Sequence, residues 1–194
     1  MFKTQIKFQR ILCLVALVAA ALTFVYALGV ITDIYEGLFF TMSYPKDPHL
    51  TEVEGSWIYY DMQPFNKMLV AVGIGLILCA ILLFVTNTNS RRKYYVGNLV
   101  ATVIFSVASL AATVWAYINI FKFRAQFLAI DFEAWLKYSE EWDRPYTEST
   151  FWFDAGLVVF GLTVLVSALL IFNFIWKKKL MKEEQNLIQL GKEA

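Results

Sequence analysis

MLVAVGIGLILCAILLFVT, the stretch that occupies Met68–Thr86, contains no Asp, Glu, Lys, Arg or His. Three further stretches share this property, and they cover residues 11–32, 95–121 and 155–176. A helix needs roughly 20 apolar residues to cross about 30 Å of hydrocarbon. The sequence therefore predicts an all-α integral membrane protein, built as a bundle of four transmembrane helices.

The remaining segments of the 194-residue chain flank or connect these spans. A basic leader covers residues 1–10 and a tail covers residues 177–194, on either side of a membrane domain over residues 11–176. The two predicted outer loops cover residues 33–67 and 122–154, and the first of them is too rich in Tyr, Phe and Trp for a disordered linker. We expect these two loops to fold into a structured extracytoplasmic cap.

Charge placement predicts one orientation in the membrane. Basic residues gather in the leader, in the short second loop and at the start of the tail, at Lys3, Lys7, Arg10, Arg91, Arg92, Lys93, Lys177, Lys178 and Lys179. Since basic flanks stay in the cytoplasm, we expect a multi-pass cell-membrane protein with both termini cytoplasmic. The first apolar run exceeds the roughly 7–15 residues of a signal-peptide core, which favours a retained anchor. The predicted outer loops lack an N-x-[ST] acceptor, which favours a bacterial inner membrane.

Small residues recur at intervals of three and four along the first and third spans. In lipid, helices associate by close packing at small residues, because burying apolar surface gives no net gain there. We expect these two helices to form the central contact. The predicted packing residues are Ala16, Ala20, Thr23, Ala27, Gly75, Thr102, Ser106, Ser109 and Thr113. The hydroxyls among them can donate to their own helix, or they could line a hydrated path.

The outer loops contain the second set of candidates. No Gly or Pro occurs between Asn98 and Arg144, which predicts a long third helix, a bend near residues 121–124 and an amphipathic continuation. That continuation could lie in the interface, pack on the first loop or meet a partner. In the first loop, residues 56–60 resemble a short strand, and residues 34–42 suit a hairpin or an interfacial helix. The candidate partner surface is Trp57, Tyr59, Tyr60, Phe127, Trp135 and Tyr138.

Motifs for chemistry are missing from the sequence. The single histidine, His49, has Asp47, Glu52 and Glu54 nearby, but these residues do not form a recognised metal spacing. No catalytic triad, zinc motif or phosphate loop occurs. The basic residues lie beside the spans, where they suit anionic lipid and not nucleic acid. We expect no metal, no cofactor and no nucleic-acid partner.

The outline of four spans with a large first outer loop resembles that of claudin-type tetraspan proteins. The resemblance covers topology alone, because Gly55, Ser56 and Trp57 occur in a loop that has no cysteine. Tetraspanins are similar in span count but carry a Cys-Cys-Gly motif that this loop lacks. No family is assigned from the sequence.

The sequence favours a non-enzymatic accessory or scaffold subunit of a larger membrane complex, in particular a transport system. Its partners would be the lipid bilayer and other membrane proteins, or further copies of itself. Two alternatives remain open. One is a homo-oligomeric channel or transporter whose hydroxyl stripe faces a shared pathway, and the other is a lipid-active enzyme at the outer interface.

Overall fold

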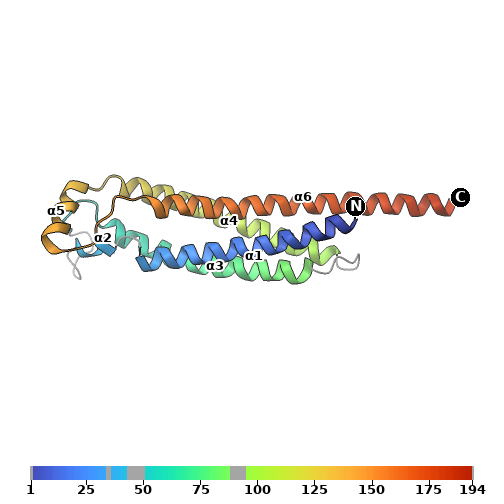
Figure 1. The fold of residues 1–194 in the computed structure, drawn as a ribbon, viewed down its shortest axis with the longest axis horizontal. Helices are drawn as coiled ribbons and strands as arrows, with labels where there is room; N and C mark the ends of the chain where they lie inside the picture. Colours follow the sequence, from blue (N-terminus) through green and yellow to red (C-terminus); the bar gives the residue numbers. More distant parts are fainter. Residues whose placement is uncertain (1, 34–35, 43–50, 88–94, 194) are drawn as a thin grey trace. The chain divides into compact units, whose positions relative to one another are not determined.

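A computed structural model describes residues 2–33, 36–42, 51–87 and 95–193. The helices are α1 (Phe2–Asp33), α2 (Glu36–Phe40), α3 (Ile58–Asn87), α4 (Tyr95–Phe127), α5 (Phe132–Trp142) and α6 (Phe151–Glu193) (Figure 1). Apart from one isolated antiparallel bridge between Met42 and Thr51, the regular structure of these ranges is helical. The helices α1, α3, α4 and α6 are long and apolar enough to cross a membrane, and they contain the four predicted spans.

The chain divides into two compact units, and each long helix contributes to both. Unit 1 comprises residues 1–22, 75–113 and 161–194, so it contains both termini. Unit 2 comprises residues 23–74 and 114–160, and it also contains α2 and α5.

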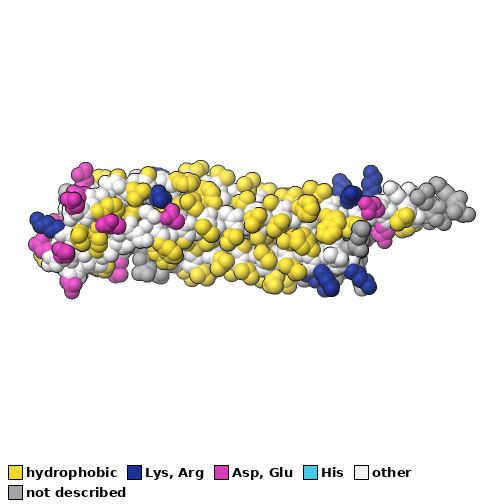
Figure 2. Space-filling model, turned by 45° about the horizontal axis from the view of Figure 1, so that its top comes forward, with side chains coloured by type: hydrophobic (Ala, Val, Ile, Leu, Met, Phe, Trp, Pro, Cys, Tyr) yellow, Lys and Arg dark blue, Asp and Glu magenta, His cyan; other side chains and the backbone are white. Residues whose placement is uncertain are grey.

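Apolar side chains cover the outward faces of the long helices. Figure 2 shows them along the visible surface of these helices, whereas charged side chains gather near the helix ends. In unit 1, Leu78 and Val107 are each 62% exposed. Exposed apolar side chains in this number would be unfavourable in water but suit contact with lipid or with other membrane helices.

The leader and the tail are both helical. Residues 2–10 form the first turns of α1, and residues 177–193 continue α6. The backbone is therefore helical across the boundary between the predicted leader and the first span, and across that between the fourth span and the tail. α3 likewise begins at Ile58, well before the predicted span, so the second half of the first loop belongs to a long helix.

The bend in the third helix lies further along than predicted. α4 continues through Lys122 and Arg124 and ends at Phe127. The Asp131 side chain then caps α5 by accepting a hydrogen bond from the Ala134 amide at 3.0 Å. The predicted amphipathic continuation is confirmed as α5, which ends at Asp143 in the left-handed conformation (φ 48°).

The predicted strand over residues 56–60 is wrong. The Ser56 amide donates to the Val53 carbonyl and the Ile58 amide donates to the Gly55 carbonyl, so these residues form a turn that leads into α3. Gly55 supplies a backbone φ of 85°, which a side chain would strain. The helix considered for residues 34–42 occurs in shorter form as α2.

Candidate functional site

The predicted packing residues are largely buried, each within its own unit. In unit 1 these are Ala16, Ala20, Thr102, Ser109 and Thr113, and in unit 2 they are Thr23 and Ala27. Hydrogen bonds and ring contacts join α1 to α3 and to α6 in unit 1, as between Gln9 and Asn87 and between Phe8 and Trp176. The predicted direct contact between α1 and α4 stays a prediction.

Gly75 does not occupy the close contact that was predicted for it. A Cβ atom at Gly75 would meet no atom within 4 Å, whereas one at Gly73 would lie 2.9 Å from the Phe24 Cα in unit 2. Gly73 and Gly75 are two positions apart, which corresponds to about 200° of rotation around the helix. Their positions therefore lie on nearly opposite sides of α3. Spacing alone did not indicate which of the two faced α1.

Gly156 marks the tightest approach on α6. A Cβ there would lie 2.7 Å from the Tyr26 Cζ and 2.8 Å from the Ile120 Cδ1, both in unit 2. We expect Gly156→Ala to lower the free energy of unfolding by about 1–3 kcal/mol through overpacking, as measured by thermal unfolding in detergent. Gly75→Ala is the matched control, since it enters open space and removes a flexible glycine; equal losses from both variants would contradict this packing.

Two adjoining hollows form a groove between α4 and α6 in unit 1. Their volumes are about 310 Å³ and 210 Å³, and they share Ser106, Val107 and Ile171. We call this the α4–α6 groove. Its other lining residues are Leu99, Thr102, Val103, Leu110, Val164, Ser167, Ala168 and Phe174. The walls are therefore apolar, with serine and alanine where helix backbones can approach closely.

The hydroxyls of Ser106 and Ser109 differ from those of Thr102 and Ser167, because neither has a hydrogen-bond partner among the described residues. Thr102 donates to the Asn98 carbonyl at 2.8 Å, and Ser167 donates to the Thr163 carbonyl at 2.9 Å, so both are satisfied within their own helices. The Ser106 Oγ is buried, and it has no hydrogen-bond partner within the described part of the chain. Of Ser106 and Ser109, only Ser106 lines the groove, so a bound molecule could satisfy this donor once the Ser106 side chain turns toward it.

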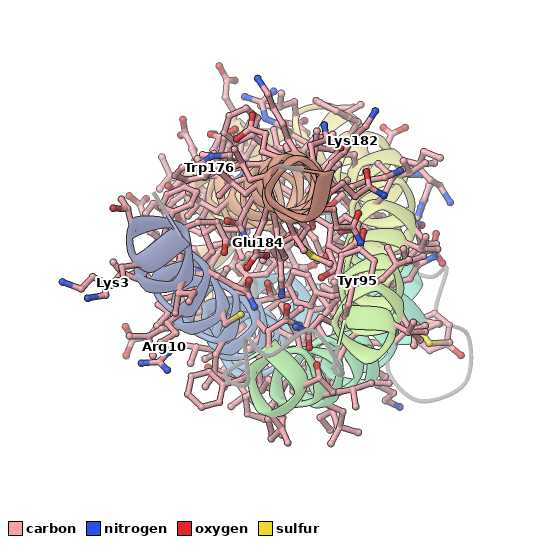
Figure 3. All side chains as sticks on the ribbon, turned by 90° about the vertical axis from the view of Figure 1, so that its right-hand side faces the viewer. Lys3, Arg10, Tyr95, Trp176, Lys182 and Glu184 are labelled. Atoms are coloured by element: carbon pink, nitrogen blue, oxygen red, sulfur yellow. The ribbon has the colours of Figure 1, made fainter. Side chains whose placement is uncertain are left out.

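Unit 1 also contains a buried amide cluster that the sequence reasoning missed. The Gln9 Nε2 donates to the Asn87 backbone carbonyl at 2.8 Å and to its Oδ1 at 3.1 Å. The Gln5 Nε2 donates to the Gln9 Oε1 and to the Asn173 Oδ1, each at 3.1 Å. Figure 3 views this end along the helices, where Lys3 and Arg10 point away from the bundle. The leader therefore has a charged outer face and an amide inner face that joins α1, α3 and α6.

Two members of the predicted partner surface are buried in unit 2. Phe127 is fully buried and Trp135 is 1% exposed. The Trp135 ring lies 6.3 Å from that of Phe127, 6.2 Å from that of Phe132 and 5.0 Å from that of Tyr146. Their assignment to a partner surface is corrected, because these rings pack against one another inside the unit, where the Trp135 Nε1 has no hydrogen-bond partner within the described residues. Trp57, Tyr59 and Tyr138 are partly exposed, and Tyr60 is exposed.

Polar contacts fix the loops of unit 2. The Tyr138 hydroxyl donates to the Phe40 carbonyl at 2.6 Å, which joins α5 to α2, and the Arg144 guanidinium lies 4.4 Å from the centre of the Phe40 ring. Burial, together with the hydrogen bond that Tyr146 donates to Glu148, raises the pKa of the Tyr146 phenol to about 12. The phenol therefore stays protonated at neutral pH.

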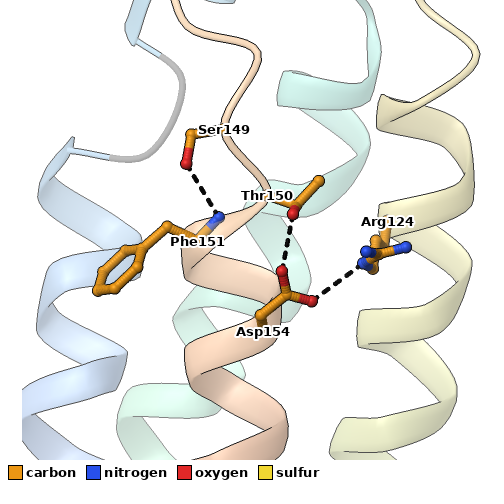
Figure 4. A network of polar contacts seen from close by, with 5 residues as sticks. All are labelled: Arg124, Ser149, Thr150, Phe151 and Asp154. Atoms are coloured by element: carbon orange, nitrogen blue, oxygen red, sulfur yellow. Dashed lines mark hydrogen bonds and ion pairs between the residues drawn. The ribbon is translucent and has the colours of Figure 1, made fainter.

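Figure 4 shows how α4 and α6 are joined near their loop ends. The Arg124 Nε donates to the Asp154 Oδ1 at 3.2 Å, and the Thr150 hydroxyl donates to the Asp154 Oδ2 at 2.7 Å. The Ser149 Oγ accepts from the Phe151 amide at the start of α6. Because both members of the ion pair are solvent-accessible, it orients the helices more than it stabilises them.

The carboxylates considered for metal binding are only partly covered by the structure. Asp47 and His49 lie outside the described residues, while Glu52 and Glu54 are exposed. Within the described ranges, no group of three or more His, Cys, Asp or Glu side chains is placed to hold a metal ion.

Comparison with protein-family models, with the curated proteins and with the solved structures finds no match to this chain.

Proposed function

We propose that this protein is a non-enzymatic accessory subunit of a larger membrane complex, in particular a transport system. The α4–α6 groove would receive a transmembrane helix of the partner subunit. In this proposal both termini face the cytoplasm, the membrane is a bacterial inner membrane, and the loops of unit 2 form an extracytoplasmic cap. The basic flanks and acidic loops of the sequence support this orientation.

The observation that carries the proposal is the α4–α6 groove, in which the Thr102 and Ser167 hydroxyls are satisfied within their own helices and the Ser106 hydroxyl is not. A lipid acyl chain could fill the groove but offers no acceptor for this hydroxyl. A partner helix offers a backbone carbonyl, which becomes accessible where that helix carries a small residue. The partner is therefore expected to place a glycine, alanine or serine opposite Ser106.

The channel alternative receives less support from the same residues. Thr102, Ser109 and Thr113 are buried within unit 1, and the Thr113 hydroxyl donates to the Ser109 carbonyl at 2.8 Å. A shared pathway between copies would need this stripe at the outer surface. Burial of Ser109 and Thr113 inside one chain favours packing over conduction for that part of the stripe, while Thr102 and Ser106 line the α4–α6 groove.

We expect Ser106→Leu to block partner binding, because the larger side chain fills the groove. The measurement is photo-crosslinking from a photoreactive residue at Val107 in native membranes, followed by mass spectrometry of the cross-linked helix. Ala111→Leu is the control, since Ala111 is exposed on the same helix but does not line the groove. Thermal unfolding in detergent verifies that both variants fold. Ser106→Ala should weaken binding only about fivefold, since it removes one membrane hydrogen bond of about 1 kcal/mol.

Other outcomes would change the assignment. Cross-links from position 107 that persist in Ser106→Leu would contradict helix binding in the groove. Cross-links to a second copy of this chain alone would favour the homo-oligomer, and flux measurements in liposomes would then be required. Cross-links to lipid alone would show that the groove holds an acyl chain.

A further inference from the structure

A second groove lies along α6 in unit 1, and the proposed accessory role does not use it. It has a volume of about 380 Å³ and is lined by Phe172, Ile175, Trp176 and Lys179. These positions follow the i, i+3, i+4, i+7 spacing that places residues on one face of a helix. Along this face, the apolar side chains of Phe172 and Ile175 are followed by the Trp176 indole and then by the Lys179 ammonium group. We call it the α6 groove.

Trp176 is held in place by a second helix. Its ring lies 6.2 Å from that of Phe8 on α1, at an interplanar angle of 59°. Packing between the two rings restricts the movement of the Trp176 side chain. The indole is apolar except for its N–H group, which can donate one hydrogen bond. Rings of this kind favour the boundary between hydrocarbon and headgroups. We therefore expect the Trp176 indole to lie at the depth where lipid headgroups begin.

The surroundings of the groove are cationic. Across residues 3–10 and 177–189, unit 1 carries six exposed Lys or Arg side chains and two exposed Glu side chains, which is a net charge of +4. The exposed cationic residues are Lys3, Lys7, Arg10, Lys178, Lys179 and Lys182, the carboxylates are Glu183 and Glu184, and Lys177 is buried. Lys and Arg side chains gather visibly at this end of the long helices in Figure 2. An anionic group at the Lys179 end of the groove would be attracted by all of them.

We propose that the α6 groove is a binding site for one anionic phospholipid. The acyl chain lies along Phe172 and Ile175, and the phosphate is bound by the Lys179 ammonium and the Trp176 indole N–H. The apolar part of the groove selects a lipid over a free phosphate. The net positive charge selects an anionic over a zwitterionic headgroup. A transmembrane helix of another protein would also fill the apolar part of the groove. An apolar helix would, however, offer no anionic group to the Lys179 ammonium.

The test compares two lipids that differ only in headgroup. Full-length protein in detergent is titrated with phosphatidylglycerol or with phosphatidylcholine of the same acyl chains, and bound lipid is counted by native mass spectrometry. We expect one molecule of phosphatidylglycerol to bind in preference. Lys179→Gln should reduce that preference about fivefold, the contribution of one lysine near anionic lipid. Trp176→Leu should reduce it as well while retaining the apolar surface.

Lys178→Gln is the matched control. It removes the same charge from the adjacent residue, which lies about 100° further round the helix and does not line the groove. Equal losses from the two lysine variants would overturn the proposal, because they would indicate diffuse attraction to the whole basic end. Equal binding of the two lipids would also overturn it, as would displacement by inorganic phosphate at the concentration of the lipid. Thermal unfolding of each variant excludes a general loss of structure.

Discussion

Trp135→Ala is expected to lower the free energy of unfolding by about 3–5 kcal/mol, the usual cost of truncating a buried tryptophan. Trp135 is 1% exposed and lies within 6.3 Å, centre to centre, of the rings of Phe127, Phe132 and Tyr146. Its removal leaves a cavity between α4, α5 and the segment that follows α5. Thermal unfolding in detergent, with tryptophan fluorescence as the signal, measures the loss.

Trp142→Ala provides the matched control, because Trp142 lies at the end of the same helix and is 57% exposed. It should change the free energy of unfolding by less than about 1 kcal/mol, as surface substitutions usually do. If Trp142→Ala were as damaging as Trp135→Ala, the aromatic cluster would not be the element that holds α5.

Gln9→Ala is expected to cost about 2–6 kcal/mol, since it removes the donor from two buried acceptors at about 1–3 kcal/mol each. The Asn87 Oδ1 and the Asn87 backbone carbonyl both lose the Gln9 Nε2 donor, whereas the Gln5 amide keeps its bond to Asn173. The first turns of α1 should therefore detach from α3. Limited trypsin digestion measures this detachment, because Lys7 and Arg10 lie in these turns. Cleavage there should accelerate at least 30-fold.

The control for this variant is Gln189→Ala on the exposed end of α6. It makes the same chemical change where the side chain contacts water, so cleavage at Lys7 and Arg10 should not change. Unchanged cleavage in Gln9→Ala itself would show that the amide cluster does not hold the first turns of α1 in place.

The burial of Phe127 and Trp135 could not be read from the sequence. An amphipathic pattern over residues 127–141 indicated that one face of the helix would be covered. The same pattern is expected whether the apolar face packs on the first loop, lies in the membrane interface or contacts a partner protein. Tertiary contacts decided this, because Tyr146 and the Phe127 end of α4 meet the ring of Trp135.

The contacts of the leader glutamines, Gln5 and Gln9, could not be predicted from the sequence either. Lys3, Lys7 and Arg10 predicted a basic leader over residues 1–10, whereas the structure buries Gln5 and Gln9 of the same segment. A hydrogen bond between distant segments, such as Gln5 to Asn173, leaves no periodic signal in either one. Such polar contacts are visible only after the helices are packed.

By itself, the sequence determined that four helices are long and apolar enough to cross a membrane. The reason is that uncharged runs of bilayer length have few other stable structures. It also determined which small residues share a helix face, since that depends on the helix period alone. Only the tertiary structure decided that Gly73 and not Gly75 meets a neighbouring helix, and that Ser106 is left with an unsatisfied hydroxyl. Apolar side chains suit lipid and protein equally well, so hydrophobicity cannot distinguish a face that packs on a helix from one that faces the bilayer.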